Sequence, residues 1–455
     1  MNFLTRLLLI FIFTAKTATG YTQNTPYNPD RLYTVDELKA DFRCLRDSIE
    51  KIHPNLYMYT PKPIFDTFFD SLYKSITQPL TDMGFYNIVT LLNGKIKNGH
   101  TMFLPGDSTT AYFNRNCRFF PFYMRILNDR LFVSMNCSPD TAIQAGAEIL
   151  SVNGTTSTAI LNFLMERQIR DGYNTTYPVW ILDNYFKEYY GFAYGHADEF
   201  TIVYKNNGIQ PQTEVINALT KDSIKYYRNT KYSNRIANDK KGRGITLELN
   251  KTDAYAILTI KTFGTESLQS TYKQNFKTTI DSVFSLINLN KCNSLILDLR
   301  DNQGGDFENG QLLLSYLLGS PFRLLMQGQA TEVVYPLKNR FSGKLYILIN
   351  GGSFSNTAIV CSRLAFYKRG IFVGEETGGN TTIISGFADD ENDIQLPNTK
   401  INCAIPNTSF LIRANSKNNG HGTIPNYYIS PNLNDIITNK DAVRNFAVRL
   451  VTKKK

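Results

Sequence analysis

From about residue 240 to residue 374, short apolar runs alternate with stretches whose apolar residues recur at helical spacing. The runs are apolar almost throughout, whereas a strand with one solvent-facing side shows polar residues at every second position. Strands without a polar face belong to parallel sheets that helices cover on both sides. We therefore expect a parallel-rich sheet with strands at 255–260, 294–299, 345–349 and 371–373. The intervening helices are predicted at 269–287, 310–318 and 355–367.

The first of two glycine-rich loops, DLRDNQGGD at 298–306, directly follows a predicted strand. In parallel α/β sheets, chemistry gathers beyond the carboxyl ends of the strands. Gly304 and Gly305 allow a sharp turn that aims backbone N–H groups into a cavity, as an oxyanion hole requires. The alternative interpretation is a turn that only connects a strand to a helix.

The second loop, NGGSFSNTA at 350–358, also lies between a predicted strand and a predicted helix. It places Ser353 and Ser355 at the start of the helix, where the helix dipole and free N–H groups favour developing negative charge. These positions suit a nucleophile. They also suit an ordinary N-cap, which needs no catalysis.

The chain before residue 240 has a different character. Thr34 and Glu37 fit a capping box at a helix start, and two further amphipathic stretches follow at 64–76 and 85–96, so 21–104 is predicted to be a helical region. Residues 105–215 are predicted to hold a small αβ domain. Its predicted elements are strands at 119–124, 130–135, 145–154 and 200–204, and a helix at 158–167. The segment AGAEILSVNG and the helix after it resemble a PDZ domain, which binds a peptide by adding it as a strand to a sheet edge.

The first twenty residues predict export. Arg6 precedes the apolar run LLLIFIF, and Ala18 and Gly20 supply the small residues of a cleavage site, which together indicate a secretory signal peptide at 1–20. No later segment is long and apolar enough for a membrane span. We therefore expect a periplasmic or extracellular protein that does not insert into the membrane after signal removal.

Composition argues against several partners and cofactors. The net charge of +10 is spread among acidic residues, whereas a nucleic-acid-binding face concentrates its basic residues. The six cysteines include no Cys-x-x-Cys or His/Cys cluster, so no metal or other cofactor is expected. Cys117 and Cys137 flank a predicted strand pair, and either a disulfide or two free thiols fits that position.

Four features come in a characteristic order: the PDZ-like segment, then DLRDNQGG, then NGGSFS at a helix start, then VGEETGG. This order resembles the tail-specific (C-terminal processing) serine protease family, which includes tricorn-like and retinoid-binding-protein-like members. The resemblance extends from HPNLYMYT at 53–60 to GTIPNYYISP at 422–431. It implies a multidomain α/β protein with a ClpP/crotonase-like catalytic domain at 235–455.

Matching the family's nucleophile motif to 352–358 implies that Ser355 is the nucleophile and Ser353 a supporting residue. The oxyanion donors would then be the backbone N–H of Gly305 or Gly304 and that of Asn356.

The same resemblance constrains the general base. Many members use a lysine 25 residues after the serine, but this chain has Asn380 there, and a carboxamide cannot accept the serine proton. The tricorn-like branch uses a histidine ahead of the PDZ-like part, where this chain has His100 in the sequence NGHT. Neutral imidazole suits a serine nucleophile near neutral pH. The alternatives are that His100 is a polar turn residue, or that His421 is the base.

The acid partner of the base is left open. Asn419 stands where the branch has its acid, and an asparagine orients a histidine without offsetting imidazolium charge. Glu375, Glu376 and Asp301 are the carboxylate candidates. The sequence therefore predicts an exported serine endopeptidase acting on peptides or proteins. The alternative is a weakened or inactive member that binds peptide or lipid, and the oligomeric state is undetermined.

Overall fold

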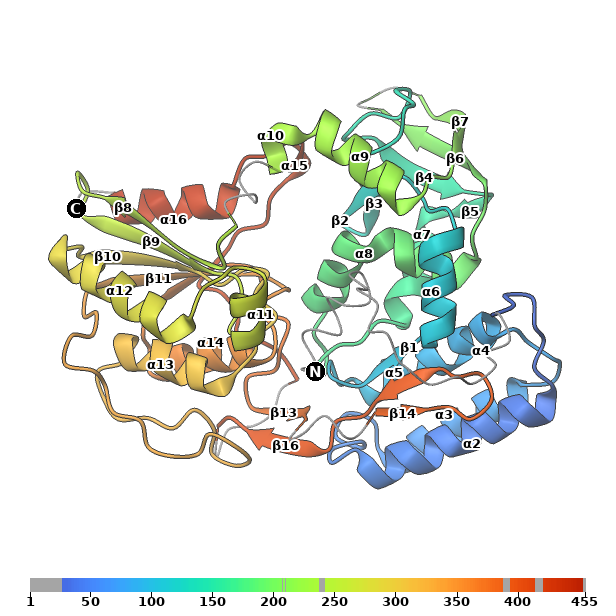
Figure 1. The fold of residues 1–455 in the computed structure, drawn as a ribbon, viewed down its shortest axis with the longest axis horizontal. Helices are drawn as coiled ribbons and strands as arrows, with labels where there is room; N and C mark the ends of the chain where they lie inside the picture. Colours follow the sequence, from blue (N-terminus) through green and yellow to red (C-terminus); the bar gives the residue numbers. More distant parts are fainter. Residues whose placement is uncertain are drawn as a thin grey trace.

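The computed structural model describes residues 27–206, 208, 210–236, 242–387, 393–413 and 420–452. Figure 1 shows a mixed α/β multidomain architecture, with the sheet of β8–β12 on one side of the molecule and the N-terminal helices and a second sheet on the other. The predicted signal peptide at 1–20 lies outside the described residues. Within those residues, no helix combines the length and hydropathy that a membrane crossing needs.

The larger unit is built on a six-stranded sheet with the order β17-β12-β11-β10-β9-β8. β9, β10, β11, β12 and β17 run parallel to one another, and only β8 at the edge is antiparallel. This is the parallel-rich sheet that the apolar runs predict. Its strands are β8 (Ile245–Asn250), β9 (Tyr255–Ile260), β10 (Ser294–Asp298), β11 (Lys344–Ile349), β12 (Ile371–Gly374) and β17 (Tyr427–Tyr428).

Both faces of this sheet are covered, which explains why its strands lack a polar side. Along β10, Leu295 and Leu297 pack in the core beneath α12, α13 and α14, whereas Ile296 points to the opposite face and packs with Val443 and Ala447 of α16. Figure 1 shows α16 above the sheet and α12, α13 and α14 below it. These helices are α11 (Thr265–Ser270), α12 (Phe276–Leu289), α13 (Phe307–Leu317), α14 (Asn356–Phe366), α15 (Leu433–Ile437) and α16 (Ala442–Thr452).

The middle unit holds an antiparallel sheet with the order β2-β3-β4-β6-β7, to which β5 adds beside β4. α7 packs on its core, and α8 lies against its edge strand β2. Asp183 of α8 accepts the Ile126 N–H of β2 at 2.7 Å and pairs with Arg125 at 2.9 Å. Its elements are β2 (Phe122–Leu127), β3 (Arg130–Asn136), β4 (Glu148–Val152), β5 (Thr155–Thr156), α7 (Ser157–Glu166), α8 (Thr176–Tyr194), β6 (Glu199–Lys205), β7 (Gln212–Asn217), α9 (Lys221–Lys231) and α10 (Ser233–Ile236).

The N-terminal region is helical, and the predicted capping box of Thr34 and Glu37 is present at the start of its first helix. Its elements are α2 (Val35–Ile52), α3 (Lys62–Ser75), α4 (Asp82–Val89), a 3-10 turn (Thr90–Leu92), α5 (Asn93–Ile96), β1 (Met102–Leu104) and α6 (Asp107–Asn116).

A small sheet joins this region to the C-terminal part of the chain. β1 pairs with β15 (Asn402–Ala404) in the register Met102↔Ala404, and β15 pairs with β14 (Asp393–Gln395). A separate hairpin-like pair is formed by β13 (Ile383–Gly386) and β16 (Thr408–Leu411). Because β1 begins two residues after His100, this pairing anchors the predicted base to the unit that carries Ser355.

Several predicted boundaries are wrong for local reasons. The helix expected at 85–96 is divided by the 3-10 turn at 90–92. The helix expected at 269–287 is two helices, because Lys273 adopts a left-handed φ of 54° and the Asn275 side chain caps α12. The strand expected at 119–124 begins at residue 122.

The cysteine alternative is also decided. All six thiols are free, including those of Cys117 and Cys137, which lie in one apolar cluster.

Candidate active site

Side-chain hydrogen bonds of Asn350 and Ser353 hold the turn between β11 and α14, which carries Ser355. The Asn350 side-chain oxygen accepts the N–H groups of Asp301 and Gly352, both at 3.0 Å. Ser353 is fully buried, and its hydroxyl donates to the Leu299 carbonyl at 2.9 Å. The turn is therefore tied to the end of the neighbouring strand β10, which places the two glycine-rich loops side by side.

Ser355 does not cap the helix that it precedes. It occupies the N-cap position of α14, but its side chain makes no capping hydrogen bond. Its backbone has φ 53° and ψ −127°, a conformation that costs a residue with a side chain free energy and that clusters at functional sites. The Ser355 Oγ lies 3.1 Å from the Nε2 of His100. The structure thus brings the predicted nucleophile and the predicted base together.

The loop that carries His100 is shaped by its own sequence, NGHT. The Asn98 side-chain oxygen accepts the His100 N–H and the Thr101 hydroxyl, both at 3.0 Å. Gly99 is needed between them because a Cβ there would lie 2.7 Å from the Phe354 ring. The loop can therefore approach the nucleophile turn closely enough for a direct contact.

The His100 ring is buried against aromatic side chains. It stacks on Phe354 with centroids 4.7 Å apart, and Phe354 stacks in turn on Tyr177 of α8 at 4.1 Å. Only 4% of His100 is exposed, and this burial lowers its pKa to about 3. The imidazole is therefore neutral at pH 7. In the tautomer with its proton on Nδ1, the Nε2 lone pair can accept the Ser355 proton.

Gly304 and Gly305 both have positive φ, 95° and 130°. Phe263 bridges this loop, because its N–H donates to the Gly304 carbonyl at 2.8 Å and its carbonyl accepts from Asp306 N–H at 3.3 Å. In such a bridge the N–H of the intervening Gly305 points away from Phe263. A Cβ on Gly304 would lie 2.8 Å from the Asn356 nitrogen, so the two predicted donor segments adjoin each other beside Ser355.

Asn356 is the first residue of α14, and the first N–H groups of a helix have no partner within it. Its side-chain amide donates to the Asp306 carbonyl at 2.6 Å. This bond fixes the start of α14 against the loop of Gly304 and Gly305.

Asn380, at the position of the family lysine, is held by three groups. Its Nδ2 lies 2.6 Å from the Tyr59 hydroxyl, its Oδ1 accepts the Thr382 N–H at 2.8 Å, and its N–H donates to Asp171 at 3.1 Å.

The predicted carboxylate candidates have other hydrogen-bond partners. Glu376 accepts the Gly422 N–H at 2.7 Å and lies 3.2 Å from the Nδ1 of His421. Glu375 accepts the Ser430 hydroxyl at 2.7 Å. Asp301 accepts the Trp180 indole N–H at 2.7 Å. Asn419 lies outside the described residues.

Three residues of this site were not singled out from the sequence. They are Asp171, Phe354 and Tyr177, which contact the base loop or the His100 ring directly or through one neighbour. Phe354 lies inside the nucleophile motif, which is a signal for it, whereas Asp171 lies in the loop before α8 and Tyr177 is the second residue of α8.

Comparison with known proteins identifies the larger unit. The sequence model of peptidase family S41 matches residues 254–428, which include the nucleophile turn and both glycine-rich loops. This region of the chain belongs to peptidase family S41. The predicted resemblance to the tail-specific (C-terminal processing) proteases is thereby confirmed.

One curated relative is carboxyl-terminal-processing peptidase 2, chloroplastic, of Arabidopsis thaliana. It is 28% identical over 123 residues, which are 26% of this chain and 24% of that protein. The alignment thus spans about a quarter of the relative's length.

Two solved structures share the overall fold. Mature CPAF complexed with lactacystin aligns with a TM-score of 0.67 at 14% identity, over 92% of this chain and 99% of that chain. Mature CPAF aligns with a TM-score of 0.64 at 13% identity, over 92% and 97% of the two chains. These likenesses cover the S41 region together with the units before it.

Proposed function

We propose that the chain is a serine peptidase that hydrolyses peptide bonds through an acyl-enzyme on Ser355, with His100 as general base. The observation that carries this proposal is the 3.1 Å approach of Ser355 Oγ to His100 Nε2 from a strained, non-capping backbone position. Membership of the 254–428 region in peptidase family S41 supports it.

In the first half of the reaction, Ser355 Oγ attacks the carbonyl carbon of the scissile bond while its proton passes to His100 Nε2. The carbonyl oxygen becomes an oxyanion, and the N–H groups of Gly305 and Asn356 stabilise it. The tetrahedral intermediate collapses as the C–N bond breaks, and the leaving nitrogen takes the proton from His100. A water molecule then repeats the sequence on the ester and releases the acid product and Ser355.

The test is labelling of the purified protein with a fluorophosphonate, which forms a covalent adduct with activated serines. The wild type should form an adduct at pH 7.5, and S355A should form none. H100Q should react about a hundredfold to ten-thousandfold more slowly, the usual contribution of a general base.

A matched control is S285A, because Ser285 is an exposed helix residue whose hydroxyl only donates to the Asp281 carbonyl. It should react at the wild-type rate. A folded wild type that forms no Ser355-dependent adduct would exclude the proposal. If that protein bound peptides without cleaving them, it would be a binding protein on the same fold.

We further propose that residues 105–215 form a PDZ-like domain that guides peptide substrates. The antiparallel sheet of β2–β7 with α7 on its core supports this assignment. The Ile126 N–H on the β2 edge already donates to Asp183, so β7 is the edge that remains for strand addition. Export, with removal of residues 1–20, remains a proposal from the sequence. N-terminal sequencing of the mature protein would test it.

A further inference from the structure

A single segment of the middle unit, residues 171–177, comprises the end of the loop between α7 and α8 and the first two residues of α8, and it reaches several loops of the candidate site. We call it the connector. Its hydrogen bonds run from Gly172 N–H to Lys97 O (2.9 Å), Tyr173 N–H to Gly420 O (2.8 Å), Asn174 Nδ2 to Thr377 O (3.0 Å), Thr176 Oγ1 to Glu376 O (2.9 Å) and Tyr177 OH to Gln303 Oε1 (3.1 Å). The connector is therefore in contact with the base loop, the oxyanion loop and the segment of Asn380 at once.

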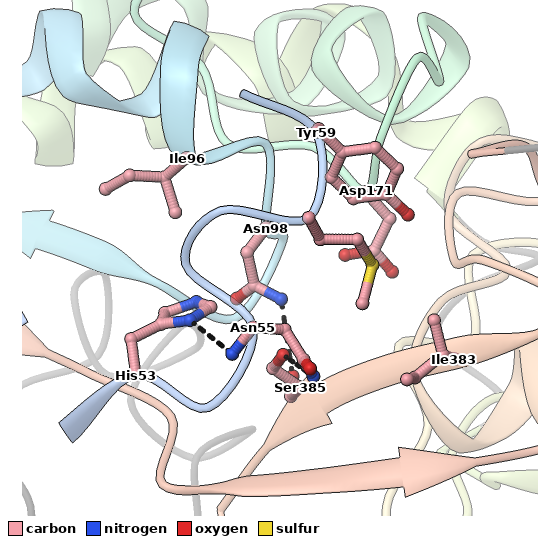
Figure 2. A pocket seen from close by; sticks show the side chains of 9 residues that line it. His53, Asn55, Tyr59, Ile96, Asn98, Asp171, Ile383 and Ser385 are labelled. Atoms are coloured by element: carbon pink, nitrogen blue, oxygen red, sulfur yellow. Dashed lines mark hydrogen bonds between the residues drawn. The ribbon is translucent and has the colours of Figure 1, made fainter. Parts of the chain in front are cut away.

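The first residue of the connector makes the closest link to the chemistry. One oxygen of Asp171 accepts the Gly99 N–H at 2.8 Å, and the other accepts the Asn380 N–H at 3.1 Å. Gly99 directly precedes His100. Asp171 is 3% exposed. Figure 2 shows it beside Tyr59 at one end of a small pocket.

A carboxylate is an unusual choice for this place. Burying one costs several kcal/mol unless its charge is compensated, and the described residues supply no ion pair to Asp171, whose oxygens bind only these two backbone groups. An asparagine has one acceptor oxygen, so it would leave one of the N–H groups without its present partner. The two-acceptor geometry is thus specific to the ionised acid.

We propose that Asp171 is a positioning residue that holds the loop of His100 and the loop of Asn380 in fixed relation, so that the imidazole stays within reach of Ser355. This inference rests on the proposed function. A displacement of about 1 Å in a reacting group can lower the rate a hundredfold. The hydrogen bond from Gly99 N–H to Asp171 fixes the backbone directly before His100, so its loss would allow such a displacement of the imidazole.

Protonation should release this clamp. Burial raises the pKa of Asp171 to about 6, well above its ordinary value near 4. The hydroxyl oxygen of the protonated acid is a weaker acceptor than a carboxylate oxygen, so one of the two N–H groups is held less tightly. Positioning should therefore weaken progressively as the pH falls through about 6.

Stability should change with the opposite sign. Because the folded-state pKa of Asp171 is raised, its contribution to stability is present at low pH and is lost as the pH rises through about 6. The labelling rate should therefore rise with pH over the range in which the free energy of unfolding falls. If Asp171 had only a structural role, the labelling rate would not rise while the stability falls.

The pKa values of His53, His100 and Tyr177 are shifted away from pH 6. Burial lowers the pKa of His53 to about 4 and that of His100 to about 3. The pKa of Tyr177 is well above 10. The groups that face Asp171 or its connector are His53, Tyr59, Lys97, His100, Arg170, Tyr173, Tyr177, Glu376 and His421. Because His421 lies in this set, it needs its own control.

The experiment measures fluorophosphonate labelling rates from pH 5 to pH 8 for the wild type, D171N, D183N and H421Q. Asp183 is a matched control, since it is a buried acid of the same unit whose pKa burial also raises to about 6, but it holds α8 against β2. The wild-type rate should fall about tenfold or more below an apparent midpoint near pH 6. D171N should label about tenfold to a hundredfold more slowly at pH 7.5 and show no midpoint near 6. D183N and H421Q should keep the midpoint.

A second readout does not need activity. The chain has four histidines, so His100 can be assigned in nitrogen-15 imidazole spectra by its absence in H100Q. D171N should shift the His100 ring signals, whereas D183N should not.

The inference is overturned if D171N keeps the midpoint near pH 6, labels at the wild-type rate, or leaves the His100 signals unchanged. A wild type that never labels refutes the proposed function instead, and the spectra then still decide the role of Asp171.

Discussion

Replacing Gly304 by alanine tests the oxyanion assignment most directly. Gly304 has φ 95°, and a Cβ there would lie 2.8 Å from the Asn356 nitrogen and 2.9 Å from the Ser355 Cβ. Contacts this close to the Asn356 backbone and the Ser355 side chain force the two loops apart, and these loops supply both proposed donors. Gly154 is a matched control, because it has φ 79° and no atom within 4 Å of its would-be Cβ.

Both variants place an alanine in a left-handed backbone conformation, but only one of them disturbs an oxyanion donor. A left-handed backbone costs an alanine roughly 1–2 kcal/mol at either position. Only G304A also displaces the Asn356 N–H, and loss of one oxyanion donor lowers the rate about a hundredfold to a thousandfold, or about 3–4 kcal/mol in the activation barrier. G304A should therefore be much slower than G154A, beyond any difference in stability.

The assay combines two measurements on each variant. Urea unfolding gives the free energy of unfolding, and fluorophosphonate labelling under conditions where both variants are folded gives the second-order rate constant. G154A should label at the wild-type rate. If G304A labelled within about threefold of G154A, the N–H groups beside Gly304 would not be the oxyanion donors.

Three further outcomes are expected. F354A removes the ring stacked between His100 and Tyr177, so it should lower the free energy of unfolding by about 3–5 kcal/mol in urea titrations and slow labelling as well. Burial lowers the pKa of His53 to about 4. The neutral imidazole therefore stabilises the fold above its unfolded-state pKa near 6.5, and this contribution is lost as the pH falls through about 4. Over this range the free energy of unfolding of the wild type should fall by up to about 3 kcal/mol more than that of H53Q. N380K in an H100Q background should not restore labelling, because the side chain at this position is directed to the Tyr59 hydroxyl and the Thr382 N–H.

The parallel sheet was predictable because its signal is local. The strand β9 has the predicted bounds Tyr255–Ile260, and β10 ends within one residue of its predicted bound. Burial on both faces leaves these strands without polar residues, and each is followed by a glycine-rich or polar loop. The nucleophile turn was predictable for the same reason, since strand, turn and helix are contiguous in the sequence.

The helix α8 (Thr176–Tyr194) was not predicted, although it is among the longest helices of the described residues. It contacts β2 on one side and presents Tyr177 and Trp180 to the active-site loops on another. A helix with partners on several sides is apolar nearly all round, so it lacks the single stripe by which a surface helix is recognised.

The contacts that complete the site are non-local. His100 is 255 positions from Ser355, and Asp171 is 72 positions from Gly99 and 209 from Asn380. Family resemblance supplied the His100 assignment, because the NGHT sequence by itself also fits a polar turn. Nothing comparable pointed to Asp171, since an aspartate in a loop is ordinarily a solvated residue.

The loss of the family lysine and the role of the connector have a common physical basis. A lysine base and its serine come from neighbouring loops of one unit, so the sheet alone sets their distance. A histidine base comes from the N-terminal region, so its distance from Ser355 depends on contacts between units. The pairing of β1 with β15 fixes the position of that loop along the chain, and Asp171 fixes the residue next to His100. In the proposed arrangement Asn380 is an anchor for Asp171 rather than a base, because its N–H gives Asp171 a second point of attachment on the S41 region.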